Sequence, residues 1–185
     1  MATTVNINDL LGASYLTGKA LQRTFQNLLE RTKLFIRMYN ESVKQQDVNS
    51  KWALLYSFGY LCNEFNEHCV FIIRSHLTSK KFKDIPTSNI ELARYFGRYI
   101  IDEFGEDSSK VEAYMDLLCN VIDKRNEIIH RIDLSWKERS RLIIYLSSLI
   151  VKPNTIEMVN FLLRYNIHTI NKGTQVYYTK PARAF

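Results

Sequence analysis

The sequence contains little glycine and proline, with six Gly and three Pro in 185 residues. Sandwiches and barrels of many short strands depend on these residues for their turns, so long helices are favoured instead. No apolar run approaches the ~20 residues that a helix needs to cross a bilayer. Residues 1–9 also have no basic region followed by an apolar core. We therefore expect neither a membrane span nor a secretory signal.

Cysteine is scarce as well. The three cysteines, Cys62, Cys69 and Cys119, are odd in number and show no C-x-x-C spacing, which indicates reduced, buried thiols in a cytoplasmic protein. No set of His, Cys, Asp and Glu has the spacing of a zinc or iron site. Phosphate-binding loops, dinucleotide fingerprints and the G-x-S-x-G motif are all missing, so those enzyme classes have no support. We predict no metal and no cofactor.

The length and the charge of the chain are informative. A chain of 185 residues suits one domain with a substantial core. The net charge is +6, and residues 151–185 account for +4 of it, with five Lys or Arg against one acid. A basic C-terminal part suits a polyanionic partner such as RNA, and a solvated tail that aids solubility is the alternative. We predict one domain over 1–185, with a core at about 14–151 and a C-terminal helix and basic tail at 152–185.

Apolar residues recur at helical spacing along most of the chain, which predicts an all-α, up-and-down bundle of roughly five to six helices. Capping residues and helix breakers set the predicted ends, among them Asn49 or Ser50, Thr87 or Ser88, Gly105 and Ser135. We predict helices over about 14–43, 51–77 and 89–104, a fourth that begins at 107–109 and leads into 117–131, a fifth that Ser135 caps, and a sixth over about 155–170 and ended by Gly173.

The helix predicted at 51–77 is apolar enough to lie at the centre of the bundle. Its apolar face includes Trp52, Tyr56 and Gly59, and we expect Gly59 to let another helix approach closely. Glu64 lies off this face. Its carboxylate either faces solvent or reaches toward a polar site at one end of the bundle.

Residues 117–131 change from an apolar helix into a polar cluster that carries chemistry. The key residues are Arg125, Asn126 and His130. Arginine binds phosphate with a planar fork of donors, asparagine both donates and accepts hydrogen bonds, and histidine moves a proton near neutral pH. This combination can cleave a phosphodiester without a metal.

The segment Arg125-Asn126-Glu127-Ile128-Ile129-His130 resembles the R-N-x-x-x-H form of the R-x(4–6)-H motif of the HEPN superfamily. The segment stands at the end of an amphipathic helix, as in that family, and the helix at 52–65 resembles the apolar HEPN helix with an embedded acid. The resemblance covers roughly residues 15–150. Arg131 stands where many members have glycine. The resemblance implies an HEPN-like bundle that forms a homodimer, in which the paired motifs build one composite cleft for RNA.

The resemblance also implies an activity. HEPN ribonucleases are metal-independent endonucleases that leave 2′,3′-cyclic phosphate and 5′-hydroxyl ends on RNA. His130 would then be the general base or acid, Arg125 would stabilise the charge of the transition state, and Asn126 would orient His130 or the phosphate. Small members of the family are often toxins or antiviral effectors. Three further residues would support the site. Asp123 and Glu127 would hold Arg125 or favour the protonated form of His130, and Arg131 would add phosphate affinity.

The spacing within the motif leaves two arrangements open. On a continuous helix, Arg125 and His130 lie about 140° apart around the axis and do not share a face. Either the helix ends or turns near residues 127–130, or two chains meet and each supplies one arginine and one histidine.

Alternatives of other classes stay open beside the ribonuclease. The chain could be a non-catalytic HEPN module that dimerises or binds RNA together with an antitoxin or a defence-complex partner. The charges around Arg125 and His130 could also be solvated residues at a helix C-terminus, where they suit the macrodipole. The C-terminal aromatic and basic residues could stack on RNA bases or dock on the protein itself. The candidate RNA-binding residues are Lys124, Tyr177, Tyr178, Lys180 and Arg183.

Overall fold

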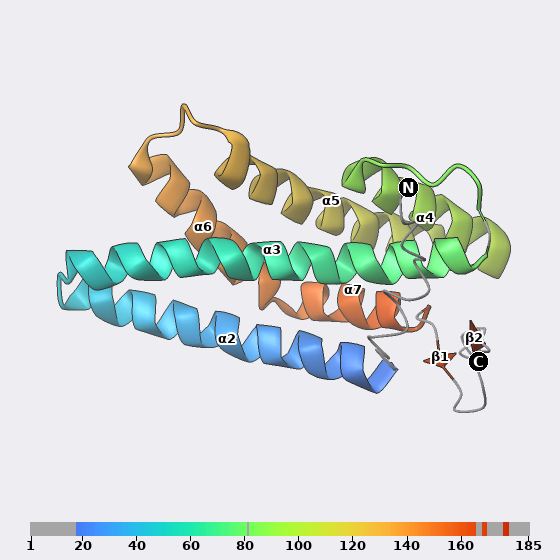
Figure 1. The fold of residues 1–185 in the computed structure, drawn as a ribbon, viewed down its shortest axis with the longest axis horizontal. Coiled ribbons are helices and arrows are strands. Elements are labelled where there is room, and N and C mark those ends of the chain that lie inside the picture. The colour runs from blue at the N-terminus through green and yellow to red at the C-terminus, as the bar shows by residue number, and fades with distance from the viewer. Residues whose placement is uncertain (1–17, 81, 166–167, 170–175, 178–185) are drawn as a thin grey trace, which may run out of the picture.

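The computed structural model describes residues 18–80, 82–165, 168–169 and 176–177. The described residues form an all-α bundle with one short ladder of two antiparallel strands (Figure 1), so the prediction of an all-α helical bundle is confirmed. No described helix is by itself long and apolar enough to cross a membrane, and α6 and α7 reach that length only as a pair bent by 62°. The elements are α2 (Gly18–Lys44), α3 (Val48–Ser79), α4 (Asn89–Phe104), α5 (Ser108–His130), α6 (Trp136–Ile150), α7 (Pro153–Leu163), β1 (His168–Thr169) and β2 (Val176–Tyr177).

Helix α3 is the centre of the bundle, as its apolar composition predicts. It contacts α2, α4, α5, α6 and α7, and Figure 1 shows α2 along one side of it and α4 and α5 along the other. Its inward side chains are fully buried, among them Phe58, Phe65, Ile72, Ile73 and Leu77. Cys62, Cys69 and Cys119 are buried, free thiols, as expected.

Local capping signals account for most helix ends. The Ser88 side chain accepts from the Glu91 N–H at the start of α4, and Gly105 ends that helix with φ 63°, where glycine adopts the left-handed conformation without a Cβ clash. Ser135 and Glu138 form a complete capping box at α6. These three predictions are confirmed.

Helix α3 begins earlier in the chain than the sequence predicts. The predicted cap is Asn49 or Ser50, but the carboxylate of Asp47 accepts from the Ser50 N–H at 3.1 Å and caps the helix two or three residues earlier. Aspartate is among the strongest caps, because its side chain accepts the orphan amide of the first turn.

The last helix is shorter than its apolar pattern predicts. It begins at Pro153, where a proline loses no hydrogen bond, and it ends at Leu163 instead of near Ile170, since residues 168–169 form β1. The reason is a contact from the core: the ring Nδ1 of His76 in α3 donates to the carbonyl of Tyr165 at 2.7 Å. This carbonyl is therefore bonded to α3 and not to a further turn of α7. Gly173, the predicted end, lies outside the described residues.

The close helix approach occurs at a different glycine from the one predicted. A Cβ added to Gly59 would meet no atom within 4 Å, so no helix packs closely there and that prediction is wrong. At Gly97 in α4, by contrast, an added Cβ would lie 2.6 Å from Cγ of Met115 in α5. The absence of a side chain at Gly97 therefore lets α4 and α5 pack together.

The two glycines should respond oppositely to the same substitution. Gly59→Ala is expected to raise the free energy of unfolding by up to about 1 kcal/mol, because it adds helix propensity in open space. Gly97→Ala is expected to lower it by about 1–3 kcal/mol, because the new methyl group overlaps Met115 in the core. Urea unfolding of both variants checks this, and a change of the same sign in both would contradict it.

Candidate functional site

Arg125 lies on the face of α5 that packs against α3. Two of its neighbours on that face, Val121 and Ile122, are buried in the core. The Arg125 guanidinium is partly buried and donates to two amide oxygens: Oδ1 of Asn63 in α3, and Oδ1 of Asn126 at 2.9 Å. Two helices therefore hold this side chain in one orientation.

The charge of Arg125 has no carboxylate partner among the described residues. Asn63 and Asn126, its hydrogen-bond partners, are neutral, and its Nε is buried with no partner in the part of the chain that the structure describes. Burial raises the pKa of the neighbouring Cys62 thiol well above its usual range, and the Arg125 charge opposes that rise. A partly buried cation that nothing neutralises is costly, so an anion such as a phosphate would be stabilised at this position.

His130 is exposed and does not contact Arg125 within the described chain. Helix α5 is regular up to His130, and the Arg131 N–H still donates to the Glu127 carbonyl at 3.2 Å. No bend before the end of the helix turns the two side chains toward each other. A straight helix places Arg125 and His130 about 140° apart, so one chain by itself does not bring them to one point.

The acids of the motif pair with Lys124. Its ammonium lies 2.5 Å from the Glu127 carboxylate and 3.7 Å from that of Asp123, and the hydrogen bond to Glu127 raises the pKa of Lys124. The expectation that these acids hold Arg125 is not what the structure shows. Lys124, a candidate RNA-binding residue, has its charge balanced locally.

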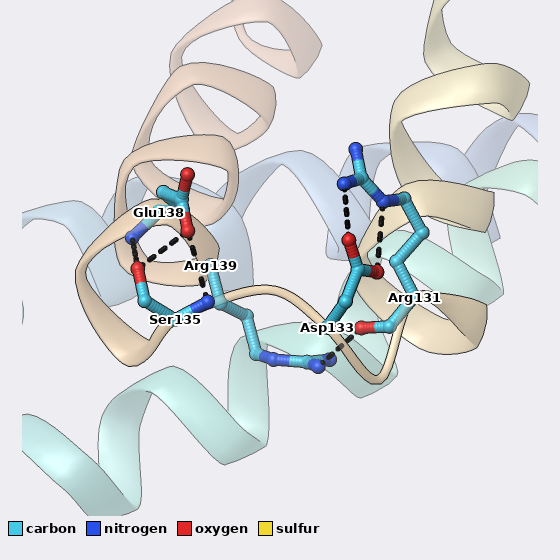
Figure 2. Close-up of polar contacts among 5 residues, drawn as sticks. All are labelled: Arg131, Asp133, Ser135, Glu138 and Arg139. Atoms are coloured by element: carbon cyan, nitrogen blue, oxygen red, sulfur yellow. Dashed lines mark hydrogen bonds and ion pairs between the residues drawn. The ribbon is translucent and has the colours of Figure 1, made fainter.

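Arg131 is also paired. It is exposed and forms a two-pronged ion pair with Asp133, with distances of 3.1 and 2.5 Å (Figure 2). This pairing lowers the pKa of the Asp133 carboxyl. Arg131 would need to leave Asp133 before it could give its full charge to a phosphate.

Arg139 is a functional neighbour that sequence reasoning missed. From the first turn of α6 its guanidinium reaches back and donates to the carbonyl of Ile128. It also donates to the carbonyl of Arg131 at 2.8 Å (Figure 2). These carbonyls belong to the end of α5, where a helix leaves its last acceptors unpaired. One feature of the sequence could have indicated this role: Arg139 is a cation in the first turn of a helix, where the macrodipole disfavours a positive charge.

Replacing Arg139 with alanine should destabilise the C-terminal end of α5, the helix that carries the motif. Two carbonyls lose their charged donor, so the free energy of unfolding should fall by about 1–3 kcal/mol. Hydrogen exchange at residues 127–131 should accelerate together with the loss in urea stability. Arg141→Ala, an exposed arginine of the same helix, is the matched control and should change stability by less than about 0.5 kcal/mol. An equal effect of both variants would contradict the capping role.

An exposed aromatic surface, formed by Tyr56 and Tyr60, lies on α3 one to two turns before Asn63. Tyr56 and Tyr60 of α3 expose 76% and 69% of their surface, so the prediction that Tyr56 belongs to a buried face is wrong. The Trp52 ring stacks on that of Trp136 at the start of α6, with centroids 3.3 Å apart, and the Tyr56 ring lies 6.2 Å from Trp136. This contact joins α3 to the helix that follows the motif.

The remaining candidates lie elsewhere. Glu64 accepts from Arg31 of α2 at 2.7 Å and so does not reach the motif. Tyr177 is described only as part of β2, and Tyr178, Lys180 and Arg183 lie outside the described residues. Within the described part of the chain, no group of three or more His, Cys, Asp or Glu residues could hold a metal ion.

Comparison of the chain with models of protein families, with curated proteins and with solved structures finds no match. The residues that the structure brings together are Arg125, Asn126 and Asn63, with the aromatic surface of α3 beside them.

Proposed function

We propose that this chain is an HEPN-like, metal-independent endoribonuclease that cleaves RNA to 2′,3′-cyclic phosphate and 5′-hydroxyl ends. The observation that carries the proposal is the Arg125 guanidinium, a partly buried cation that two asparagine side chains hold in place and that pairs with no carboxylate of the described residues. A fixed donor of this kind suits a phosphate whose negative charge grows during the reaction.

The reaction would use the 2′-hydroxyl of RNA as its nucleophile. His130 removes the proton of that hydroxyl as the general base, or protonates the leaving 5′-oxygen as the general acid. The 2′-oxygen forms a bond to phosphorus while the bond from phosphorus to the 5′-oxygen breaks. Arg125 stabilises the additional negative charge on the phosphoryl oxygens, and Asn63 and Asn126 keep its donors oriented. The need for a 2′-hydroxyl restricts the substrate to RNA.

A homodimer would complete the site. Arg125 and His130 of one chain lie on different faces of α5, so the histidine that serves one arginine would come from the second chain. A two-fold axis then makes both contacts equivalent. In this form the protein would act as a toxin or antiviral effector that cuts cellular or invading RNA.

A second candidate function follows from the same geometry. Since Arg125 and His130 do not meet within the described chain, the motif could bind RNA without cleaving it. The chain would then be an HEPN module that dimerises and works with an antitoxin or a larger defence complex.

Cleavage of labelled total RNA and tRNA in the presence of EDTA tests the proposal. The protein is used at a concentration where light scattering confirms the dimer. We expect cleavage that EDTA does not inhibit, with cyclic phosphate at the 3′ ends. Intact RNA under these conditions would favour the binding module and contradict the ribonuclease.

A further inference from the structure

We propose that Tyr56 and Tyr60 form a stacking platform for bases of single-stranded RNA beside the phosphate site at Arg125. This inference rests on the proposed function and deepens it, because it names the form of RNA that the site accepts. A single strand offers exposed bases and a phosphate chain together. A duplex would keep its bases stacked and paired.

The two tyrosines are placed and exposed as such a platform requires. They are four residues apart on α3, so they lie about 6 Å apart along its axis on nearly the same face. Successive stacked bases are about 3.4 Å apart, so the spacing of the two side chains is close to that of two rings with one base between them. Large exposed areas on both rings leave their faces accessible.

The platform leads directly to the phosphate site. Asn63 follows Tyr60 by three residues on the same side of α3, and its amide oxygen accepts from the Arg125 guanidinium. Gly59 lies between Tyr56 and Asn63, and a Cβ added there would meet no atom of the described residues within 4 Å. Along α3, the two exposed tyrosines therefore lie one to two helical turns from Asn63, the residue that accepts from the guanidinium.

Charge complementarity favours nucleic acid as the occupant of this surface. Arg125 is a partly buried cation with neutral amide partners, and an RNA phosphate would neutralise it while the adjoining base stacks on tyrosine. A purely apolar partner would cover the rings and leave the cation without an anion.

The two tryptophans provide a local probe for the test. The chain has two Trp, they stack on each other, and the Tyr56 ring lies 6.2 Å from Trp136. A short single-stranded RNA with 2′-O-methyl groups cannot be cleaved by attack of the 2′-oxygen, so its binding is separate from catalysis. Anisotropy of the labelled oligonucleotide gives Kd, and quenching of tryptophan fluorescence locates the bound strand.

We expect Tyr56→Ala and Tyr60→Ala each to weaken binding of this oligonucleotide about tenfold or more. The phenylalanine variants at both positions should bind as the wild type does, because they keep the ring. Tyr145→Ala removes another exposed tyrosine, from α6, and should leave Kd unchanged. Wild-type affinity in both alanine variants would overturn the platform. It would also be overturned if the alanine variants lost the dimer and kept their affinity for RNA, because the tyrosine surface would then bind a second copy of the chain.

Failure of the platform and failure of the ribonuclease remain distinguishable. If the alanine variants weaken oligonucleotide binding while cleavable RNA stays intact with the wild type, the platform stands and the nuclease proposal fails. If the wild type cleaves RNA and the alanine variants keep both its KM and its kcat, the nuclease stands and the platform is overturned.

Discussion

His130→Ala is expected to lower RNA cleavage by at least about 10²–10⁴-fold, because it removes the group that transfers protons to or from the sugar oxygens. Arg125→Ala is expected to cost about 10²–10³-fold, because the developing phosphoryl charge loses its fixed donor. His130 is exposed at the end of α5, whereas the Arg125 guanidinium is partly buried against α3, so the fold of each variant is measured together with its activity. Initial rates on labelled RNA with EDTA, together with circular dichroism and light scattering, check activity, fold and dimer.

Arg141→Ala is the matched control for charge. It removes an exposed arginine of α6 that is not among the candidate site residues, so cleavage should change much less than in the Arg125 variant. A wild-type rate in His130→Ala would contradict a catalytic role of the motif. It would leave the binding module as the better explanation of the same residues.

Mixing the two inactive variants tests where the histidine comes from. In a heterodimer of Arg125→Ala and His130→Ala chains, an intact arginine and an intact histidine remain on opposite chains. If the site combines residues across the two-fold axis, cleavage should return on mixing. If each site lies within one chain, the mixture should stay as inactive as its components.

Acid is expected to destabilise the fold because two histidines are buried in neutral form. Desolvation lowers the pKa of His68 to about 4, where its ring stacks against Phe25. Burial also lowers the pKa of His76. The unfolded chain takes up these protons near pH 6.5, so the stabilising contribution is complete above that pH and is lost as the pH falls from about 6.5 to 4. For His68 the loss amounts to about 3 kcal/mol.

Urea unfolding between pH 7.5 and 4 measures this effect. His68→Phe keeps an aromatic ring next to Phe25 but cannot bind a proton, so its stability should fall less steeply with pH than that of the wild type. Phe25→Leu is the control that disturbs the same contact without removing the titrating group. Its stability should be lower at every pH, with the wild-type slope. An unchanged slope in His68→Phe would contradict the assignment.

Much of the fold was predictable because its signals are local. The Ser88 cap, the left-handed Gly105 and the capping box of Ser135 and Glu138 each depend on residues within one turn of one another. The central place of α3 followed from its apolar length. The end of α7 was not predictable, because it depends on the bond from His76, 89 residues before Tyr165 in the chain.

The candidate site likewise has some residues that the sequence identifies and others that only the structure identifies. Arg125, Asn126 and His130 are visible in the sequence as a combination of side chains suited to phosphodiester chemistry. No pattern near these residues predicts the contact with Asn63, which lies 62 residues before Arg125 and accepts from its guanidinium. The role of Arg139 was hidden as well, because it bonds carbonyl groups, which every residue carries.

The sequence by itself determined the helical class, most helix ends and the chemical content of the motif, since hydrophobic periodicity and capping act between near neighbours. Only the tertiary structure decided which groups meet. It separated Arg125 from His130 around a straight helix, placed Gly97 and not Gly59 at the close helix contact, and left Tyr56 and Tyr60 exposed. Such contacts depend on how whole helices rotate and cross when they bury their apolar faces, which no local pattern specifies.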